Sequence, residues 1–229
     1  MLWMKGWLEI RWRFVWALAA VLATLGGALY NGQVSAKATA GVMALMPLLW
    51  LFGAVFLAGA GIRTQSPLQG TKGLHGSTQF TLSLPVSRLR LLSVRAVMGF
   101  TAVCGVIVIS SGVAWFLFPM VRANAKAADF LSWVVAASCC AAAFHAVSIF
   151  NSTFLDEYWH VWLTVITIGF LKWLTVRFPP PASLDVFGVM GTRSPLVTHA
   201  VPWPAILLSL IFAGIVFFGA VWVAERIEY

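Results

Sequence analysis

Between two long apolar segments the chain reads Phe80-Thr-Leu-Ser-Leu-Pro-Val-Ser-Arg-Leu-Arg-Leu-Leu-Ser-Val-Arg95. Ser83 is suited to cap a helix, because its hydroxyl can accept from the backbone N–H groups of the first turn. Pro85 falls in that turn, where a missing N–H costs nothing and the fixed φ favours a helix. We therefore expect a short helix over residues 84–94. It is too basic for lipid and too apolar for free solution, so it should bind a protein partner or the membrane surface.

The composition of the whole chain indicates an integral membrane protein. Of its 229 residues, 61% are hydrophobic and 10% are charged, whereas a soluble domain is about half apolar and about a quarter charged. Each crossing of a bilayer needs about 20 apolar residues. The pattern predicts an all-α fold of six transmembrane helices in one domain, with spans at residues 14–30, 40–62, 96–120, 130–150, 159–176 and 205–223.

Residues 1–13 predict an amphipathic helix at the membrane interface. Trp3 and Trp7 fall on one face, and Lys5 and Arg13 fall on the opposite face. A Trp-rich face with a charged back suits the headgroup region. The alternative is a secretory signal peptide with residues 14–30 as its apolar core. The length and the amphipathic pattern of the first segment favour the interfacial helix.

The basic residues predict the orientation of the chain. With the N-terminus inside, nine Lys and Arg fall in cytoplasmic segments and five fall outside. The positive-inside rule then predicts that both ends are cytoplasmic. Residues 63–95 become a cytoplasmic region and residues 177–204 an external loop. The net charge of +8 is explained by this sorting and does not require a nucleic acid partner.

The run from Phe80 to Arg88, with Arg95 after it, resembles the start of the cytoplasmic coupling helix in permease subunits of ABC-2-type transporters. The resemblance implies a separate ATPase dimer that binds ATP and Mg²⁺, with no cofactor on this chain. It also implies a second permease chain, identical or related, in the plasma (bacterial inner) membrane. The family often carries an acidic residue shortly upstream, whereas this chain has none between Glu9 and Asp129.

The resemblance also implies where the ATPase would bind and what would be moved. ATPase closure would push on the helix over residues 84–94, which would continue rigidly into the third span. An exporter of an amphipathic substrate (lipid, peptide or drug) is the expected activity. The contact residues implied by the resemblance are Ser83, Pro85, Val86, Ser87, Arg88, Arg90, Leu91 and Arg95.

No motif of a self-contained enzyme is present. The Gly-rich stretch at residues 70–76 lacks the spacing of a phosphate-binding loop. Glu157 and His160 form one Glu-x-x-His pair, whereas a di-metal helical site needs two, so we expect neither a metal nor a catalytic residue. A lipid-modifying membrane enzyme centred on residues 156–160 stays an alternative, as does a non-transporting membrane anchor subunit.

The sequence also makes predictions for two ionisable side chains within the spans and for the external loop. Inside the spans we expect His145 to be neutral and hydrogen-bonded, and Lys172 to extend to the outer interface. The external loop has an apolar stretch at residues 184–190, which predicts a short re-entrant or interfacial piece before the last span.

Overall fold

The computed structural model describes residues 2–30, 36–58, 87–155, 157–181, 184–191 and 193–226. Every regular element in these ranges is a helix, which confirms the all-α prediction for the described part of the chain. The long helices are α1 (Leu2–Tyr30), α2 (Ala36–Phe56), α4 (Arg88–Leu117), α6 (Ala127–Ser152), α7 (Glu157–Arg177) and α10 (Trp203–Arg226). The short helices are α5 (Pro119–Asn124), α8 (Val186–Met190) and α9 (Pro195–Thr198).

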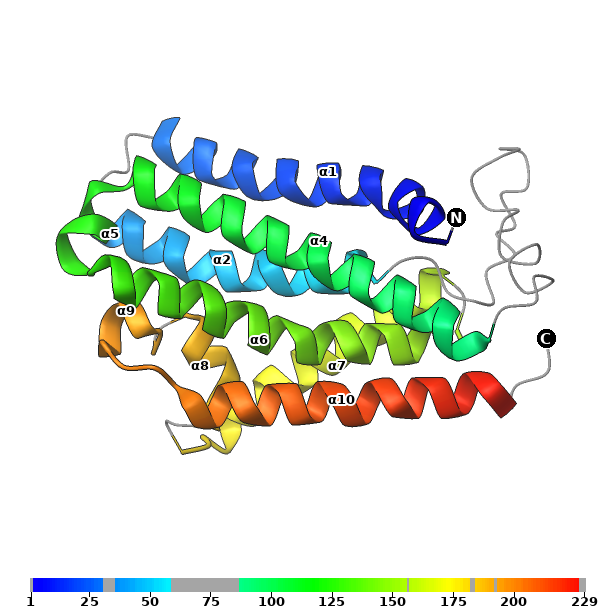
Figure 1. Cartoon of the computed structure of the whole chain (residues 1–229). Coiled ribbons are helices and arrows are strands. Elements are labelled where there is room, and N and C mark those ends of the chain that lie inside the picture. The colour runs from blue at the N-terminus through cyan, green and yellow to red at the C-terminus, as the bar shows by residue number, and fades with distance from the viewer. Residues whose placement is uncertain are drawn as a thin grey trace.

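The long helices lie side by side in one bundle with α6 at its centre (Figure 1). α6 packs against α2, α4, α7 and α10, and also against α8 and α9. α1 packs along α4 and α2. α1 begins and α10 ends at the same end of the bundle, which we call the terminal end. α5, α8 and α9 lie at the opposite end, which we call the loop end.

Among the residues that the structure describes, four helices are long and apolar enough to cross a bilayer, namely α4, α6, α7 and α10. α2 adds a shorter apolar stretch, Leu45–Phe56. Much of the apolar surface faces outward: on α7, Trp162, Ile166 and Phe170 are all about half exposed or more. A soluble monomer rarely exposes so large an apolar patch, so the chain is a membrane protein. Six crossings are two more than these four helices provide.

The first helix differs from its prediction. Residues 2–30 form one helix, with no break between an interfacial segment and a span. Its buried stripe of Ile10, Ala17, Val21 and Leu25 runs through the expected boundary. This stripe packs on α4 and α2, so the same buried face continues through the expected boundary.

The third predicted span continues the basic helix at its start and differs from the prediction where it ends. α4 begins at Arg88 with Ser87 as its N-cap, so the basic turns and the span are one helix. Ser83, Pro85 and Val86 lie outside the described residues. The helix ends at Leu117 instead of residue 120. Pro119 cannot donate the next backbone hydrogen bond, and it opens α5 instead.

The loop between α7 and α10 is folded onto the loop end of the bundle. Residues 186–190 form α8, which confirms a short structured piece, and Val189 and Met190 are buried. Trp133 of α6 donates its indole N–H to the carbonyl of Met190 at 2.9 Å. The Trp133 ring lies 5.0 Å from the ring of Trp50 on α2. α8 is thereby held against the aromatic core of the bundle.

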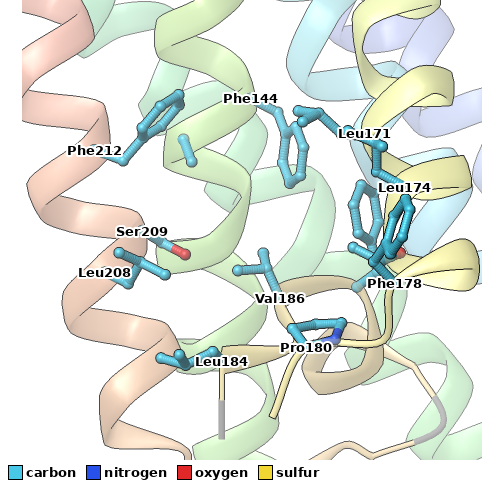
Figure 2. Close-up of a pocket in the computed structure, with 13 residues that line it drawn as sticks. Phe144, Leu171, Leu174, Phe178, Pro180, Leu184, Val186, Leu208, Ser209 and Phe212 are labelled. Atoms are coloured by element: carbon cyan, nitrogen blue, oxygen red, sulfur yellow. The ribbon is translucent and has the colours of Figure 1, made fainter. Parts of the chain in front are cut away.

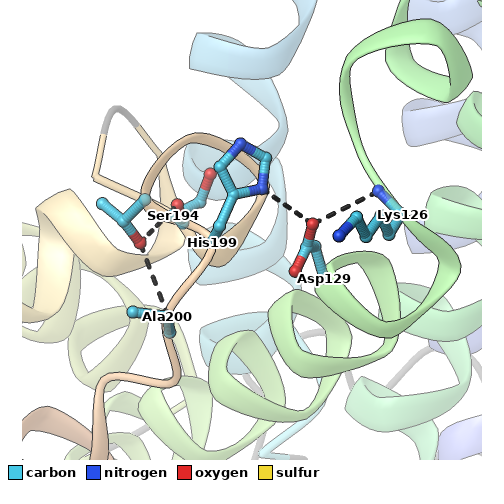
Figure 3. Close-up of polar contacts among 6 residues, drawn as sticks. Lys126, Asp129, Ser194, His199 and Ala200 are labelled. Carbon is cyan, nitrogen blue, oxygen red and sulfur yellow. Dashed lines mark hydrogen bonds and ion pairs between the residues drawn. The ribbon is translucent and has the colours of Figure 1, made fainter.

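A second contact fastens the loop where α9 ends. His199 has a φ of 53°, a left-handed conformation in which His is enriched among non-glycine residues. Its Nδ1 lies 2.7 Å from Oδ2 of Asp129 in the first turn of α6 (Figure 3). The same carboxylate oxygen accepts the backbone N–H of Lys126 at 3.2 Å. The start of α6 and the end of α9 therefore share one carboxylate.

Candidate functional site

The basic start of α4 is an ordered, amphipathic helix end. The Ser87 hydroxyl accepts the backbone N–H of Arg90 at 3.3 Å, which satisfies one of the unpaired donors of the first turn. Leu92 is fully buried, whereas Leu89 and Arg90 are exposed. Leu92 belongs to an apolar cluster with Ala58, Ile149, Ala220, Val221 and Ala224. The first turns of α4 are thus packed on α6 and α10 at the terminal end.

This packing determines which of the predicted ATPase-contact residues are exposed at the surface. Ser87 and Arg90 are exposed, and Leu91 and Arg95 are half-buried. The backbone of Arg88 opens the helix. The arrangement can offer positive charge to an acidic surface or to lipid headgroups, because its apolar side is already covered by the bundle.

The C-terminal end of α2 is the second feature, and sequence reasoning did not find it. The last carbonyls of a helix have no partner within the helix. Here the carbonyl of Ala54 lies 3.0 Å from Nδ1 of His145. The Ser148 hydroxyl donates to Val55 O at 3.2 Å. Arg13 of α1 donates to Phe56 O at 3.4 Å, with its guanidinium carbon 5.6 Å from the Phe56 ring centroid. We call these three side chains and three carbonyls the α2-end cluster.

His145 links three helices within this cluster. Its side chain is buried, and its Nε2 lies 3.3 Å from the carbonyl of Ala96 on α4. The expectation of a hydrogen-bonded His in the fourth span is confirmed. Arg13 was expected on the charged face of an interfacial helix, but it lies against the end of α2, where a cation is favourable to the helix dipole.

An apolar pocket of about 460 Å³ lies between α7 and α10, with α6 behind it (Figure 2). Figure 2 shows Leu208 and Phe212 of α10 on one side and Leu171 and Leu174 of α7 on the other, with Phe144 of α6 between them. Val186, Pro180 and Leu184 close one end of the space. The remaining lining residues are Ala143, Thr175, Phe178, Phe187 and Ser209.

The polar side chains that line this pocket are already hydrogen-bonded within the protein. The Ser209 hydroxyl donates to Sγ of Cys140 at 3.7 Å. The Thr175 hydroxyl donates to the carbonyl of Lys172 at 2.8 Å. Because both hydroxyl hydrogens are used within the protein, the side chains that line the pocket give it an essentially apolar interior. A volume of this size lies in the range of small-molecule sites.

Two cations lie against rings that line the pocket. Nζ of Lys172 lies 5.1 Å from the ring centroid of Phe187. The guanidinium carbon of Arg177 lies 6.0 Å from the ring centroid of Phe178. Both distances are within the range of cation–π attraction. Lys172 therefore lies against α8 at the loop end, and its extension to the outer interface stays a prediction.

The structure describes only part of the segment at residues 156–160, on which the alternative enzyme hypothesis is centred. His160 is fully buried, and its carbonyl accepts the hydroxyl of Thr164 at 2.7 Å. Asn151 donates to that hydroxyl at 2.9 Å. Asp156 and the side chain of Glu157 lie outside the described part. Across the described ranges, no group of three or more His, Cys, Asp and Glu is placed to hold a metal ion.

In comparisons with family models, curated proteins and solved structures, nothing matches this chain. Its function therefore has to be inferred from the arrangement of its own residues.

Proposed function

We propose that this chain is the permease subunit of an ATP-driven transporter of the ABC-2 type, an exporter of an amphipathic substrate. A separate ATPase dimer would bind ATP and Mg²⁺ and dock on the start of α4. The chain would cross the plasma membrane six times with both ends in the cytoplasm. A second permease chain, identical or related, would complete the pathway.

The observation that carries this proposal is the continuity of α4. Exposed Arg90 and buried Leu92 belong to the same helix that runs on to Leu117. A force applied to its first turns would be transmitted along the helix axis, because there is no intervening loop to absorb it. About 30 residues at 1.5 Å each give a lever of about 45 Å, longer than the hydrocarbon core.

The packing of the same turns supports a role in transmission. Leu92 contacts the cluster that includes Ile149 of α6 and Ala224 of α10, so movement of the α4 start must also move these helices. Farther along, the α2-end cluster joins α1, α2, α4 and α6 through His145 and Arg13. The terminal end of the bundle would then respond to an ATPase as a unit.

The test is charge reversal at the docking surface. The variant Arg88→Glu/Arg90→Glu should lose co-purification with the ATPase encoded nearest to this chain, with at least a tenfold drop in bound ATPase, because two favourable contacts become repulsive. The matched control is Arg122→Glu/Lys126→Glu at the loop end, which should bind the ATPase normally. Thermal unfolding in detergent checks that both variants are folded.

Normal ATPase binding by the Arg88→Glu/Arg90→Glu variant would show that α4 is not the docking site. Absence of any complex between the unmodified chain and a candidate ATPase would remove the transporter assignment altogether. ATPase turnover in the complex, compared with that of the ATPase alone, gives a second readout of coupling.

A further inference from the structure

We propose that the pocket between α7 and α10 is a binding site for the acyl chain of an anionic phospholipid of the membrane, with Lys172 and Arg177 holding its headgroup. The inference needs only the membrane character of the bundle. It is independent of ATPase docking on α4, so the two proposals can fail separately.

The first argument is the depth and opening of the pocket. Leu171 and Leu174 belong to the last two turns of α7, and Leu208 and Phe212 belong to the first three turns of α10. At 1.5 Å per residue these positions lie within about 15 Å of the helix ends, which is the depth of the acyl chains of one leaflet. Leu208 and Phe212 are nearly half exposed, so the pocket opens sideways to lipid.

The second argument is the chemistry of the lining. The Ser209 and Thr175 hydroxyl hydrogens are bonded within the protein, and the other lining side chains are apolar. A polar ligand would lose its hydrogen bonds to water without replacement, which is costly. An alkyl chain loses none. The interior therefore selects an alkyl chain over a peptide or a sugar.

The third argument is charge. Lys172 and Arg177 lie against Phe187 and Phe178, two rings of the pocket wall. In the part of the chain that the structure describes, neither cation forms an ion pair with a carboxylate. The nearby Asp185 is engaged otherwise, because it caps α8 through Gly188 N at 2.9 Å and pairs with Arg193 at 3.5 Å. Two uncompensated cations beside an apolar pocket complement a phosphate attached to an acyl chain.

The spacing of the cations along α7 fits a lipid. Arg177 is in the last turn of the helix, at headgroup level. Lys172 is five residues deeper, and its long side chain can extend toward the surface. The apolar lining continues inward to Leu171 and Phe144. The site thus changes from charged to apolar in the same direction as a phospholipid does.

The test uses phosphatidylglycerol that carries a photoreactive group at the end of one acyl chain, added to the purified full-length protein in detergent. Mass spectrometry of crosslinked peptides should find the label on residues 171–178 and 208–212. Phosphatidylcholine with the same chains should label these peptides more weakly. The variant Lys172→Gln/Arg177→Gln should lower phosphatidylglycerol labelling to the phosphatidylcholine level, by about fivefold per cation removed.

A matched pair of variants tests the pocket itself. Leu208→Trp fills the pocket and should abolish labelling of residues 171–178. Leu210→Trp on the same helix should leave labelling unchanged, because Leu210 is similarly exposed (44% against 46%) but does not line the pocket. Equal labelling of the two variants would mean that the lipid is only part of the general bilayer contact, and would overturn the proposal.

Two further outcomes would also overturn it. One is equal labelling by phosphatidylcholine and phosphatidylglycerol, which would remove the role of the two cations. The other is loss of labelling when inorganic phosphate alone is added at matched ionic strength, which would identify a site for a free anion. Labelling that resists phosphate and depends on Lys172, Arg177 and Leu208 supports the phospholipid.

Discussion

Single side chains from distant parts of the sequence complete the end of α2. His145 follows Ala54 by 91 positions, and Ser148 follows Val55 by 93. These two contacts differ in one respect. The carbonyl of Val55 also accepts the backbone N–H of Ala58 at 3.3 Å, whereas in the described residues Ala54 O lies against Nδ1 of His145. The two side chains should therefore differ in their contribution to stability.

We predict that His145→Leu lowers the free energy of unfolding by about 1–3 kcal/mol, because the buried carbonyl of Ala54 loses its contact with the imidazole Nδ1. Ser148→Ala should cost less, about 0.5–1 kcal/mol, since Val55 O keeps its backbone donor. Thermal unfolding of both variants in the same detergent measures the difference. Equal losses of unfolding free energy in the two variants would mean that the contact with Ala54 O contributes no more to stability than the contact with Val55 O.

Gly99 permits the close approach of α4 to this cluster. A Cβ at this position would lie 2.6 Å from Leu57 O and 2.8 Å from Cε1 of His145. The nearer atom belongs to the backbone and cannot move cheaply. Gly112 lies in the same helix, and a Cβ added there would meet no atom within 4 Å, so it is a matched control.

We predict that Gly99→Ala destabilises the protein by about 1–3 kcal/mol through overpacking. Gly112→Ala should instead stabilise it by up to about 1 kcal/mol through helix propensity. The midpoints of thermal unfolding should move in opposite directions. A Gly99→Ala variant as stable as Gly112→Ala would contradict the close packing of α4 on α2 and α6.

At the scale of the element, the start of α4 depends on its cap. Ser87 and Ser83 both have the right chemistry for an N-cap, and the sequence favoured Ser83 because Pro85 follows it. In the described part of the helix the capping bond is made by Ser87. Local preference cannot choose between two such serines, because the packing of Leu92 on α10 also influences the position of α4.

We predict that Ser87→Ala destabilises the first turn of α4 by about 1 kcal/mol without unfolding the bundle. Hydrogen exchange at the amides of residues 89–91 should become about fivefold faster, whereas residues 100–110 should be unaffected. Ser87→Asp should restore slow exchange, because Asp also caps helices and suits their positive end. Unchanged exchange in Ser87→Ala would show that the cap is dispensable.

At the scale of the whole molecule, the bundle places the start of α1, the start of α4 and the end of α10 together (Figure 1). The topology that we propose, with six crossings and both ends inside, would put this end in the cytoplasm and the loop end outside. In α1, Arg11 and Arg13 precede the predicted span at residues 14–30, which has no charged residue.

We predict opposite labelling from the two sides of the membrane. In a cysteine-free background, a cysteine at position 90 should react with an impermeant thiol reagent only in inverted vesicles. Cysteines at positions 37, 126 and 193 should react only from outside in intact cells. Reaction of position 37 from the cytoplasmic side would mean that α1 does not cross, and would contradict the six-span topology.

The sequence by itself determined the membrane class, the helical fold and the presence of a short structured piece within residues 184–190. These follow from local properties, since the length and the composition of an apolar run are visible in a few neighbouring residues. The continuity of α1 was missed, because the charges of residues 1–13 suggested an interface. The buried stripe from Ile10 to Leu25, which is visible only in the tertiary structure, shows that residues 2–30 pack as one continuous helix.

Only the tertiary structure decided the α2-end cluster and the pocket. Arg13 and His145 meet the end of α2 because three helices cross there, and no spacing in the sequence encodes that meeting. The pocket is likewise assembled from α6, α7, α10 and the folded loop, elements whose lining residues span positions 143 to 212. Such sites arise from long-range packing, which hydrophobic periodicity and charge patterns do not specify.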